Sequence, residues 1–358
     1  MRDIMRIIVL SVLLGCSPPK KNGAPKTRED IPILPSPNAE LYAVGSVAPK
    51  DWLVAQQSEG FPWDEALSGA AAKMGLDFSE SPTLSAARWV ATQAGYPYLV
   101  ERIILGRVSA SQVPEGLHDA IKAQVGPRGH VGLARVRRGS EDLWVALVGK
   151  GGTKLPIFSR FFSLNAEFRI NIPGLDWLLL SPSSRIFSGN SAIDLPLSEE
   201  GEWWLEIRNR GSILSSLPLY VGITDPPTNF FSDFQFYPET PEDIEKRVHR
   251  MINSLRRGEG LSEVRLDGAL KTLGLQPLED ESKRDVQLAL SRMVALGYPE
   301  EFSYQGVCVD DSVGTCLDAL SWDIDARRIL LHSKVNLLGV QSEIRTDRIT
   351  IVLTLSHM

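Results

Sequence analysis

The side chains that most often carry out chemistry are spread thinly along this sequence. No two histidines have the spacing of a metalloprotease helix, and the chain lacks a nucleophile elbow, a phosphate-binding loop and a dinucleotide-binding glycine pattern. The five histidines stand one by one, at His118, His130, His249, His332 and His357. Residue types and spacing alone therefore indicate no complete catalytic constellation.

Aspartates gather in the C-terminal part of the sequence, where they could attract calcium. They are Asp310, Asp311, Asp318, Asp323 and Asp325. An EF-hand places its acidic ligands at alternating positions of one short loop, and the spacing here differs from that pattern. Because runs of like charge are usually solvated, an acidic surface is the simpler interpretation.

Two cysteines lie close together near the C-terminal end. Cys308 and Cys316 form an even pair, which in an exported protein is typical of a disulfide, with two buried thiols as the alternative. A bond that closes so short a loop would stabilise the fold by roughly 2–3 kcal/mol on the chain-entropy model. We therefore expect a local staple, not the framework of the fold.

Two adjacent tryptophans lie in residues 201–207, which are predicted to form a central strand. Neighbouring residues of a strand point to opposite faces, so only one of Trp203 and Trp204 need enter the core. The outward ring would either pack against a neighbouring domain or serve as a platform for a ligand such as a sugar.

The third cysteine, Cys16, ends a short apolar run at the N-terminus. The run is shorter than the roughly 20 apolar residues of a spanning helix, and with Arg2 and Arg6 before it, it has the parts of a secretory signal. The segment Leu13-Leu14-Gly15-Cys16 resembles the lipobox of bacterial lipoproteins. The resemblance implies that Cys16 is acylated and becomes the mature N-terminus; an ordinary signal peptide with an incidental cysteine is the alternative.

Composition places the remainder among globular proteins. A chain of 358 residues with 43% apolar and 23% charged residues has room for two or three domains. Its net charge of −6 argues against nucleic acid as a partner, since phosphate binding wants a basic face. No second long apolar run occurs, so lipid alone would hold the protein at a membrane.

Periodicity divides the chain into segments. Residues 1–15 are expected to be the signal peptide. Residues 16–49, which include a stretch rich in Pro, Lys, Asn and Gly up to about residue 38, are expected to form a flexible tether. Residues 50–152 predict helices from Pro62 to Gly75, over 82–94 and over 115–124, followed by a hairpin. Several short alternating stretches in residues 153–225 predict an immunoglobulin-like β-sandwich.

A second α+β segment follows a linker at residues 226–240. Within residues 241–358, Thr240 and Pro241 begin a helix with a capping-box pattern. Further helices are expected near 285–296 and 316–331, and a closing strand pair at 335–340 and 349–355. The predicted fold class is therefore α+β, with two α+β modules separated by a small all-β sandwich.

The two α+β modules match each other in order and spacing. Asp64-Glu65-Ala66-Leu67 corresponds to Asp267-Gly268-Ala269-Leu270, and Gly95-Tyr96-Pro97 corresponds to Gly297-Tyr298-Pro299. The step from Asp64 to Gly95 is 31 residues and that from Asp267 to Gly297 is 30. Gly132 and Gly339 each open a strand pair. A long period that occurs only twice indicates duplication.

Short motifs in these modules resemble those of a known family. Asn253-Ser254-Leu255-Arg256, followed by residues 260–261 and 266–270, resembles the opening of the CAP (or SCP) superfamily. In the first module, residues 101–104 and 109–110 resemble the family's Glu-Asn-Ile segment. His118 and then Val131-Gly132 resemble its final histidine segment and closing strand, a place filled in the last module by residues 325–331 and 338–340. The resemblance implies α-β-α sandwiches.

The family's cavity presents two histidines and two acidic residues that can hold a divalent metal, and this sequence departs from it. Only Glu101 and His118 match such positions, as a possible remnant site; solvated surface groups are the alternative reading. The departures are Arg102 for Asn, Asp119 for Arg, Ala326 for the last module's histidine and Gln305 for its glutamate. A metal site needs three or four ligands, so no metal or other cofactor is expected.

The sequence thus predicts a non-catalytic lipoprotein of the bacterial cell envelope, at the outer membrane or facing the periplasm. The membrane would be reached through the N-terminal lipid, and the modules would bind or assemble with an envelope protein, glycan or lipid. One alternative is a CAP-like hydrolase or metal-binding protein that uses Glu101 and His118. The other is a carbohydrate-binding protein that uses the β-sandwich.

Overall fold

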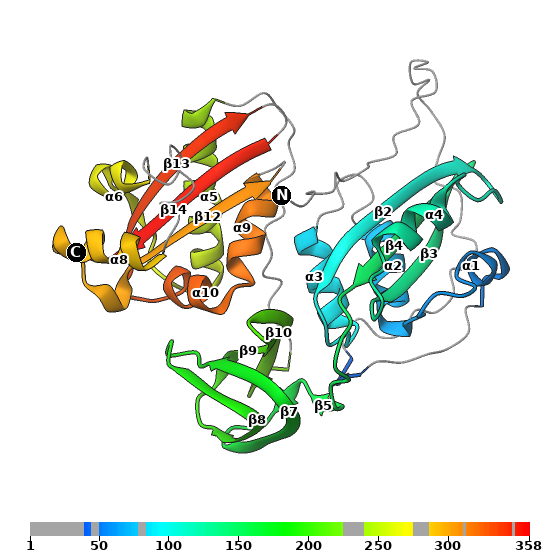
Figure 1. Cartoon of the computed structure of the whole chain (residues 1–358), viewed down its shortest axis with the longest axis horizontal. Helices are drawn as coiled ribbons and strands as arrows, with labels where there is room; N and C mark the ends of the chain where they lie inside the picture. Colours follow the sequence, from blue (N-terminus) through cyan, green and yellow to red (C-terminus); the bar gives the residue numbers. More distant parts are fainter. Residues whose placement is uncertain are drawn as a thin grey trace.

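The computed structural model describes residues 39–43, 50–77, 84–224, 240–274, 286–310, 313–345 and 348–358. Cys16 and the expected signal peptide lie outside these residues. Two α+β units and an all-β unit are seen in Figure 1, with the first α+β unit on the right, the second on the left and the all-β unit below. No helix among the described residues is long and apolar enough to cross a membrane.

Residues 39–43 of the expected tether are structured. Strand β1 (Leu41–Tyr42) pairs antiparallel with β5 (Phe158–Ser159). Tyr42 is fully buried, and its hydroxyl donates to the carbonyl of Pro218 at 2.8 Å. A flexible tether up to residue 49 is therefore wrong for these residues, because a buried aromatic ring holds them against the all-β unit.

The first α+β unit is a three-stranded antiparallel sheet between two helical layers. Its strand order is β2 (Val100–Ser109), β4 (Glu141–Gly149), β3 (His130–Arg138). The helices are α1 (Trp52–Gln57), α2 (Glu65–Asp77), α3 (Leu84–Gln93) and α4 (Leu117–Gln124). Along β4, Val145 packs with α2 and α3, whereas Trp144 packs with α1 and α4. This alternation produces an α-β-α sandwich.

Helix α2 begins where Asp64 caps it. The Asp64 carboxylate accepts a hydrogen bond from the Leu67 N–H at 2.8 Å, and its own N–H donates to Val131 at 2.9 Å. The sequence predicted that Gly75 ends this helix, but α2 continues past it to Asp77. A Cβ at Gly75 would come within 2.7 Å of the Val136 side chain. The small size of glycine inside α2 therefore allows the helix to pack closely on the sheet.

The second α+β unit repeats the sandwich with one more strand. The order is β11 (Arg265–Leu266), β13 (Leu337–Arg345), β14 (Arg348–Ser356), β12 (Tyr304–Asp310). One face carries α5 (Pro241–Gly258), α9 (Val313–Ser321) and α10 (Ile324–Leu330). The other carries α6 (Gly268–Leu273) and α8 (Val286–Ala295). Residues 300–302 form a short 3-10 helix, η2 (Glu300–Phe302).

Two sequence predictions for helices of this unit have different outcomes. The capping box that begins α5 is confirmed, with Thr240 and Asp243 bonding each other reciprocally. The single helix expected near 316–331 is wrong, since α9 and α10 are separate. The chain breaks at Trp322 because Asp323 caps α10, accepting from the Ala326 N–H at 2.9 Å.

The expected duplication appears in the strand register. His130 pairs with Gly149 in the first hairpin, and Leu337 pairs with Ser356 in the second, each 207 positions later. The two hairpins keep this correspondence along their full length. Because pairing register fixes which side chains face each helical layer, the two sheets present equivalent positions to equivalent helices.

The matched glycines have matched roles. A Cβ on Gly132 would lie 2.1 Å from the backbone of Leu67, and one on Gly339 would lie 2.3 Å from that of Leu270. Gly95 and Gly297 follow α3 and α8 with φ of +85° and +91°. The prediction of two related α-β-α units is confirmed.

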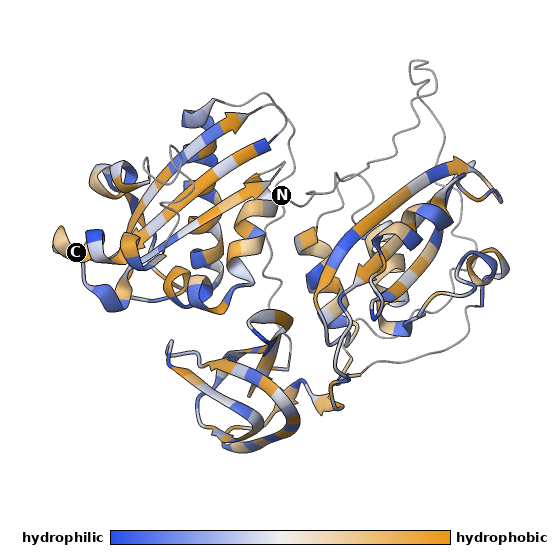
Figure 2. Cartoon of the chain, in the orientation of Figure 1, coloured by the Kyte–Doolittle hydropathy of each residue, from blue (hydrophilic) through white to orange (hydrophobic). Residues whose placement is uncertain are grey.

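The all-β unit is one five-stranded sheet. Its order is β6 (Phe161–Phe162), β10 (Ser212–Val221), β9 (Gly201–Asn209), β7 (Ala166–Leu180), β8 (Ile186–Leu197). An immunoglobulin-like domain has seven strands in two sheets, so that description is wrong. The register of β7 shifts between Ile172 and Asp176, and its two halves enclose a shared core. In Figure 2 strands of all three units carry many hydrophobic residues.

Candidate functional site

The structure gives Glu101 and His118 separate neighbours. Glu101 lies on β2 with its side chain 45% exposed, 3.8 Å from the Lys150 ammonium. His118 lies in the first turn of α4, and its ring packs 4.6 Å from that of Phe61. Among the described residues no hydrogen bond or ion pair joins Glu101 to His118, and no three His, Cys, Asp or Glu side chains are placed to hold a metal ion.

The corresponding positions of the second unit are also occupied by packing. Ala326 is fully buried in the first turn of α10. Gln305 is buried on β12, where its amide donates to the Thr354 hydroxyl at 3.1 Å. The aspartates nearby diverge: Asp318 is buried, Asp323 caps α10, and the side chain of Asp325 is 57% exposed. Asp311 lies outside the described residues.

Cys308 and Cys316 form a disulfide, with Cα atoms 5.4 Å apart. The equivalent of Cys308 in the first unit is Gly106, since Gly106 pairs with Trp144 and Cys308 with Ile351 at matching positions of β4 and β14. A Cβ on Gly106 would meet Pro114 at 2.4 Å, and Pro114 follows eight residues later, as Cys316 follows Cys308. The same strand-to-helix connection is held by close packing in one unit and by a covalent bond in the other.

Trp203 and Trp204 point to opposite faces of β9, and both are buried. Trp203 is 1% exposed in the core of the all-β unit, where its ring stacks on Phe187. Trp204 is 5% exposed and packs edge-on against Trp322 of the second unit, 5.2 Å between ring centres. The guanidinium of Arg327 covers Trp204 at 3.9 Å. Neither ring is a ligand platform, because the second α+β unit covers the outward one.

All three units meet around Trp322, in a cluster that we call the junction (Arg88, Trp204, Glu206, Asp318 and Trp322). Arg88 of α3 bonds Asp318 of α9 at 3.2 Å. The Ser216 hydroxyl of β10 donates to the Trp322 carbonyl at 2.8 Å. These contacts join segments more than a hundred residues apart in sequence.

A buried carboxylate lies in the junction. Glu206 of β9 accepts from the Ile324 N–H at 3.3 Å and is paired with Arg208. Burial raises the pKa of Glu206 to about 7, although the nearby Arg208 opposes the shift. Burial also raises the pKa of Asp323, which lies close to it.

A hollow of about 400 Å³ lies on the first unit, on the side of α1 that faces β3. Its lining residues are Asp51, Trp52, Leu53, Ser111 and Arg135. Trp52 is 71% exposed, more than any other tryptophan, tyrosine or phenylalanine among the described residues. We call this site the Trp52 hollow.

Paired charges form the wall of the Trp52 hollow. One oxygen of Asp51 accepts from the Leu53 N–H at 2.9 Å, and the other accepts from Arg135 Nε at 2.9 Å. Arg135 also donates through Nη1 to Asp142 at 3.1 Å. Burial opposes ionisation of Asp142, but hydrogen bonds from Arg137, the Ser111 N–H and Arg135 outweigh it and hold its pKa below the ordinary value. Two carboxylates thus balance two guanidiniums.

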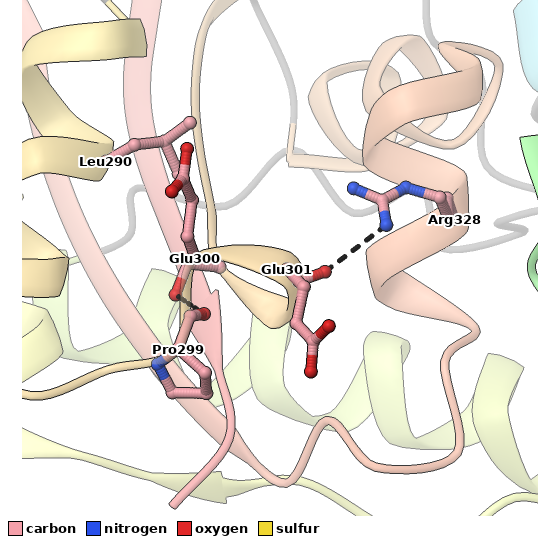
Figure 3. Close-up of a pocket in the computed structure, with 6 residues that line it drawn as sticks. Leu290, Pro299, Glu300, Glu301 and Arg328 are labelled. Atoms are coloured by element: carbon pink, nitrogen blue, oxygen red, sulfur yellow. Dashed lines mark hydrogen bonds between the residues drawn. The ribbon is translucent and has the colours of Figure 1, made fainter.

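A second hollow, of about 590 Å³, lies on the second unit. It is lined by Leu290, Pro299, Glu300, Glu301, Ser303 and Arg328. Figure 3 shows the Arg328 guanidinium reaching the Glu301 carbonyl, at 3.2 Å, while the Glu301 carboxylate points elsewhere. The matching loop of the first unit contacts the all-β unit instead, since Pro97 accepts from the Ser215 hydroxyl at 2.5 Å.

A scan of the sequence against protein-family models finds no match, and a search of curated proteins finds none either. Among solved structures, an outer surface protein from Borrelia burgdorferi is 11% identical, with a TM-score of 0.29, over 34% of this chain and 97% of that one. The CAP domain of enterococcal PrgA is 12% identical, with a TM-score of 0.27, over 33% of this chain and 63% of that one.

A cysteine-rich secretory protein from Staphylococcus aureus is 11% identical, TM-score 0.29, over 72% of this chain and 80% of that one. Likeness at these TM-scores is too slight to place the chain in a family.

Sequence reasoning missed the Trp52 hollow, although part of it has a signal. Arg135 and Arg137 alternate on one strand, and Arg137 pairs directly with Asp142 across the hairpin, so a charged cross-strand pair is readable from spacing. Nothing in the sequence indicates that Trp52 stays exposed, because exposure depends on what the rest of the fold leaves uncovered.

Proposed function

We propose that this chain is a non-catalytic binding protein held at the bacterial cell envelope by a lipid on Cys16. The observation that carries the proposal is the Trp52 hollow, where an exposed aromatic ring lies beside a rigid, charge-balanced polar network. Exposed aromatic and arginine side chains are typical anchors of recognition sites.

The titration behaviour of the hollow suits recognition. A general acid or base works best when its pKa lies near the operating pH. Burial alone would lower the pKa of Arg135, but its bonds to Asp51 and Asp142 outweigh burial and raise it. The pKa of the base Arg135 is raised and the pKa of the acid Asp142 is lowered, so both groups keep their charges and present a fixed hydrogen-bonding surface.

Attachment is tested at Cys16. Acylation requires the thiol, so wild-type protein is expected in the membrane fraction with a lipid-modified Cys16, and the Cys16→Ser variant in the soluble fraction. Mass spectra that show an unmodified mature N-terminus downstream of Cys16 would contradict the anchor.

The enzymatic alternative is tested by metal titration. A CAP-like hydrolase or metal-binding protein would use Glu101 and His118, which have no contact with each other among the described residues. Calorimetric titrations with Zn²⁺ and with Ca²⁺ are expected to give the same heats for wild type and for the Glu101→Ala/His118→Ala variant. Binding that disappears in the double variant would favour the alternative.

A further inference from the structure

We propose that the Trp52 hollow binds a neutral sugar unit of a glycan. The inference rests on the proposed binding function and names its ligand class. It moves carbohydrate recognition from the all-β unit, where Trp203 and Trp204 are buried, to the first α+β unit.

The Trp52 ring is free to contact a ligand. At 71% exposure it leaves most of a large apolar surface in water, and within the described part of the chain it has no ring contact or hydrogen bond. The residues on both sides of it are held: the Asp51 carboxylate bonds the Leu53 N–H at 2.9 Å. A ring presented on a fixed backbone loses little freedom when a ligand covers it, and the C–H face of a pyranose is an apolar surface of suitable shape.

Hydrogen-bond donors lie beside the Trp52 ring. A guanidinium has five N–H groups. Arg135 directs three of them to Asp51 and Asp142, so two remain for a ligand. The Ser111 hydroxyl accepts from Arg137 at 3.3 Å, which leaves its own proton to donate. Sugar hydroxyls accept such bonds, and planar side chains fixed by ion pairs make them without further ordering.

The charges of the polar network beside the Trp52 ring cancel. Asp51 and Asp142 carry two negative charges, and Arg135 and Arg137 carry two positive ones, in one bonded network. A hollow with no net charge has no preference for an anion or a cation, whereas hydrogen-bond donors and an apolar face together match a neutral polyhydroxyl ligand. Membrane insertion would need an extended apolar surface, and the ring instead shares the hollow with the charged side chains of Asp51 and Arg135.

The size and the backbone of the Trp52 hollow also suit a ligand. The volume of about 400 Å³ falls in the range of ligand pockets, roughly 300–1,000 Å³. Ser111 has a φ of +68°, a conformation that costs a non-glycine residue about 1 kcal/mol or more. Its N–H bond to Asp142, 2.6 Å long, holds it in place. The strained residue thus keeps its side chain at the edge of the hollow.

The experiment uses the full-length Cys16→Ser chain, which cannot carry the proposed lipid. Chitotetraose, cellotetraose, maltotetraose and mannotetraose are titrated calorimetrically, with heparin as an anionic comparator and phosphatidylglycerol vesicles as a membrane comparator. At least one neutral oligosaccharide is expected to bind. Trp52→Ala should weaken that binding by roughly tenfold or more, as truncation of an aromatic anchor does.

Two further variants make the result specific. Trp52→Phe keeps an aromatic face and should stay within about threefold of wild type, since most of the contact area remains. Leu164→Ala removes an apolar side chain that is also exposed, 49%, but lies in the all-β unit, and should leave binding unchanged. Circular dichroism spectra should match for all variants.

Three results would overturn the proposal: no neutral oligosaccharide binds, binding is unaffected by Trp52→Ala, or only heparin or vesicles bind. These results leave the broader binding function testable. If oligosaccharides fail while Trp52→Ala still abolishes the cellular role, the hollow binds another class of ligand. If Trp52→Ala also has no cellular effect, the proposed function fails with it.

Discussion

At the scale of single residues, the polar side chains quoted for the family resemblance in the second unit are structural. Asn253 is buried on α5, and its side chain exchanges hydrogen bonds of 2.8 and 3.0 Å with the backbone of Val264. Arg256, one turn later, is fully buried and donates to the carbonyls of Leu330 and Val335 at 2.6 and 2.8 Å. Asn253 and Arg256 thus fasten to α5 the segments that lead into β11 and β13.

Replacing Arg256 by Ala should destabilise the protein strongly. Several buried carbonyls would lose their donor, and each unsatisfied buried polar group costs about 1–3 kcal/mol. A loss of about 3 kcal/mol or more in the free energy of unfolding is expected, measured by urea denaturation. The neighbouring Arg257, with its side chain 64% exposed, is the matched control, and Arg257→Ala should cost less than about 0.5 kcal/mol. Equal effects of the two changes would contradict the role given to Arg256.

At the scale of elements, the duplication is maintained where a strand meets a helix. Gly132 and Gly339 allow α2 and α6 to approach β3 and β13 so closely that a methyl group has no room. The capping aspartates Asp64 and Asp267 hold the same helices, accepting from Leu67 and Leu270, each at 2.8 Å. Close packing at the glycines and helix capping by the aspartates together explain why both units have these residues at matching positions.

Gly132→Ala and Gly339→Ala should therefore destabilise by similar amounts. The added Cβ would meet helix backbone, which cannot rotate away, so a cost of about 2 kcal/mol or more is expected for each. Gly268→Ala is the control, because nothing lies within 4 Å of its Cβ position and it begins α6. That change should be neutral or stabilise by about 0.4–1 kcal/mol. Thermal unfolding measures the stabilities of the three variants. A Gly339→Ala variant as stable as the wild type would contradict the close packing of α6 on β13.

The disulfide gives a further test at this scale. Reducing it, or changing Cys308 and Cys316 together to Ala, should lower stability by about 2–3 kcal/mol through the freed loop of the unfolded chain. The sheet should remain, since β12 keeps its full pairing with β14. Loss of the strand signal in the far-ultraviolet circular dichroism spectrum would show that the disulfide is needed for the sheet itself and not only for the connection between β12 and α9.

Sequence patterns predicted the parts of this fold that depend on local periodicity. The capping box at Thr240, the repeat and the alternating strands are all local signals, and all are confirmed. The wrong predictions depend on tertiary contacts. Gly75 packs against Val136 inside α2, and the segment around Tyr42 is held by bonds to both the first α+β unit and the all-β unit. The Trp52 hollow belongs to this second kind.

At the scale of the whole molecule, the junction decides how the second unit sits on the others. Glu206 is buried there near Asp323, which caps α10, and is paired with Arg208 of its own strand. Its pKa is raised from 4.5 to about 7 by burial, so the folded state binds a proton more tightly than the unfolded chain. The resulting stabilisation is complete below the unfolded pKa and is lost as the pH rises through about 7.

The Glu206→Gln variant should remove this pH dependence. A glutamine oxygen still accepts from the Ile324 N–H but carries no buried charge. We expect it to be more stable than wild type at pH 8, by an amount on the order of 2–3 kcal/mol, and similar to wild type at pH 4.5. Melting temperatures at the two pH values measure this. Asp325→Asn, at a side chain 57% exposed, is the control; an equal effect there would exclude Glu206 as the origin.

The central claim, that this protein binds and does not catalyse, is tested most directly by relative fitness in a deletion strain complemented with two variants. Glu101→Ala/His118→Ala should be folded, lipidated and within about 0.5 kcal/mol of wild-type stability, because both side chains are partly exposed. The account predicts wild-type fitness for that double variant and deletion-like fitness for Trp52→Ala. A folded, lipidated double variant that behaves like the deletion, beside a fully active Trp52→Ala, would contradict it.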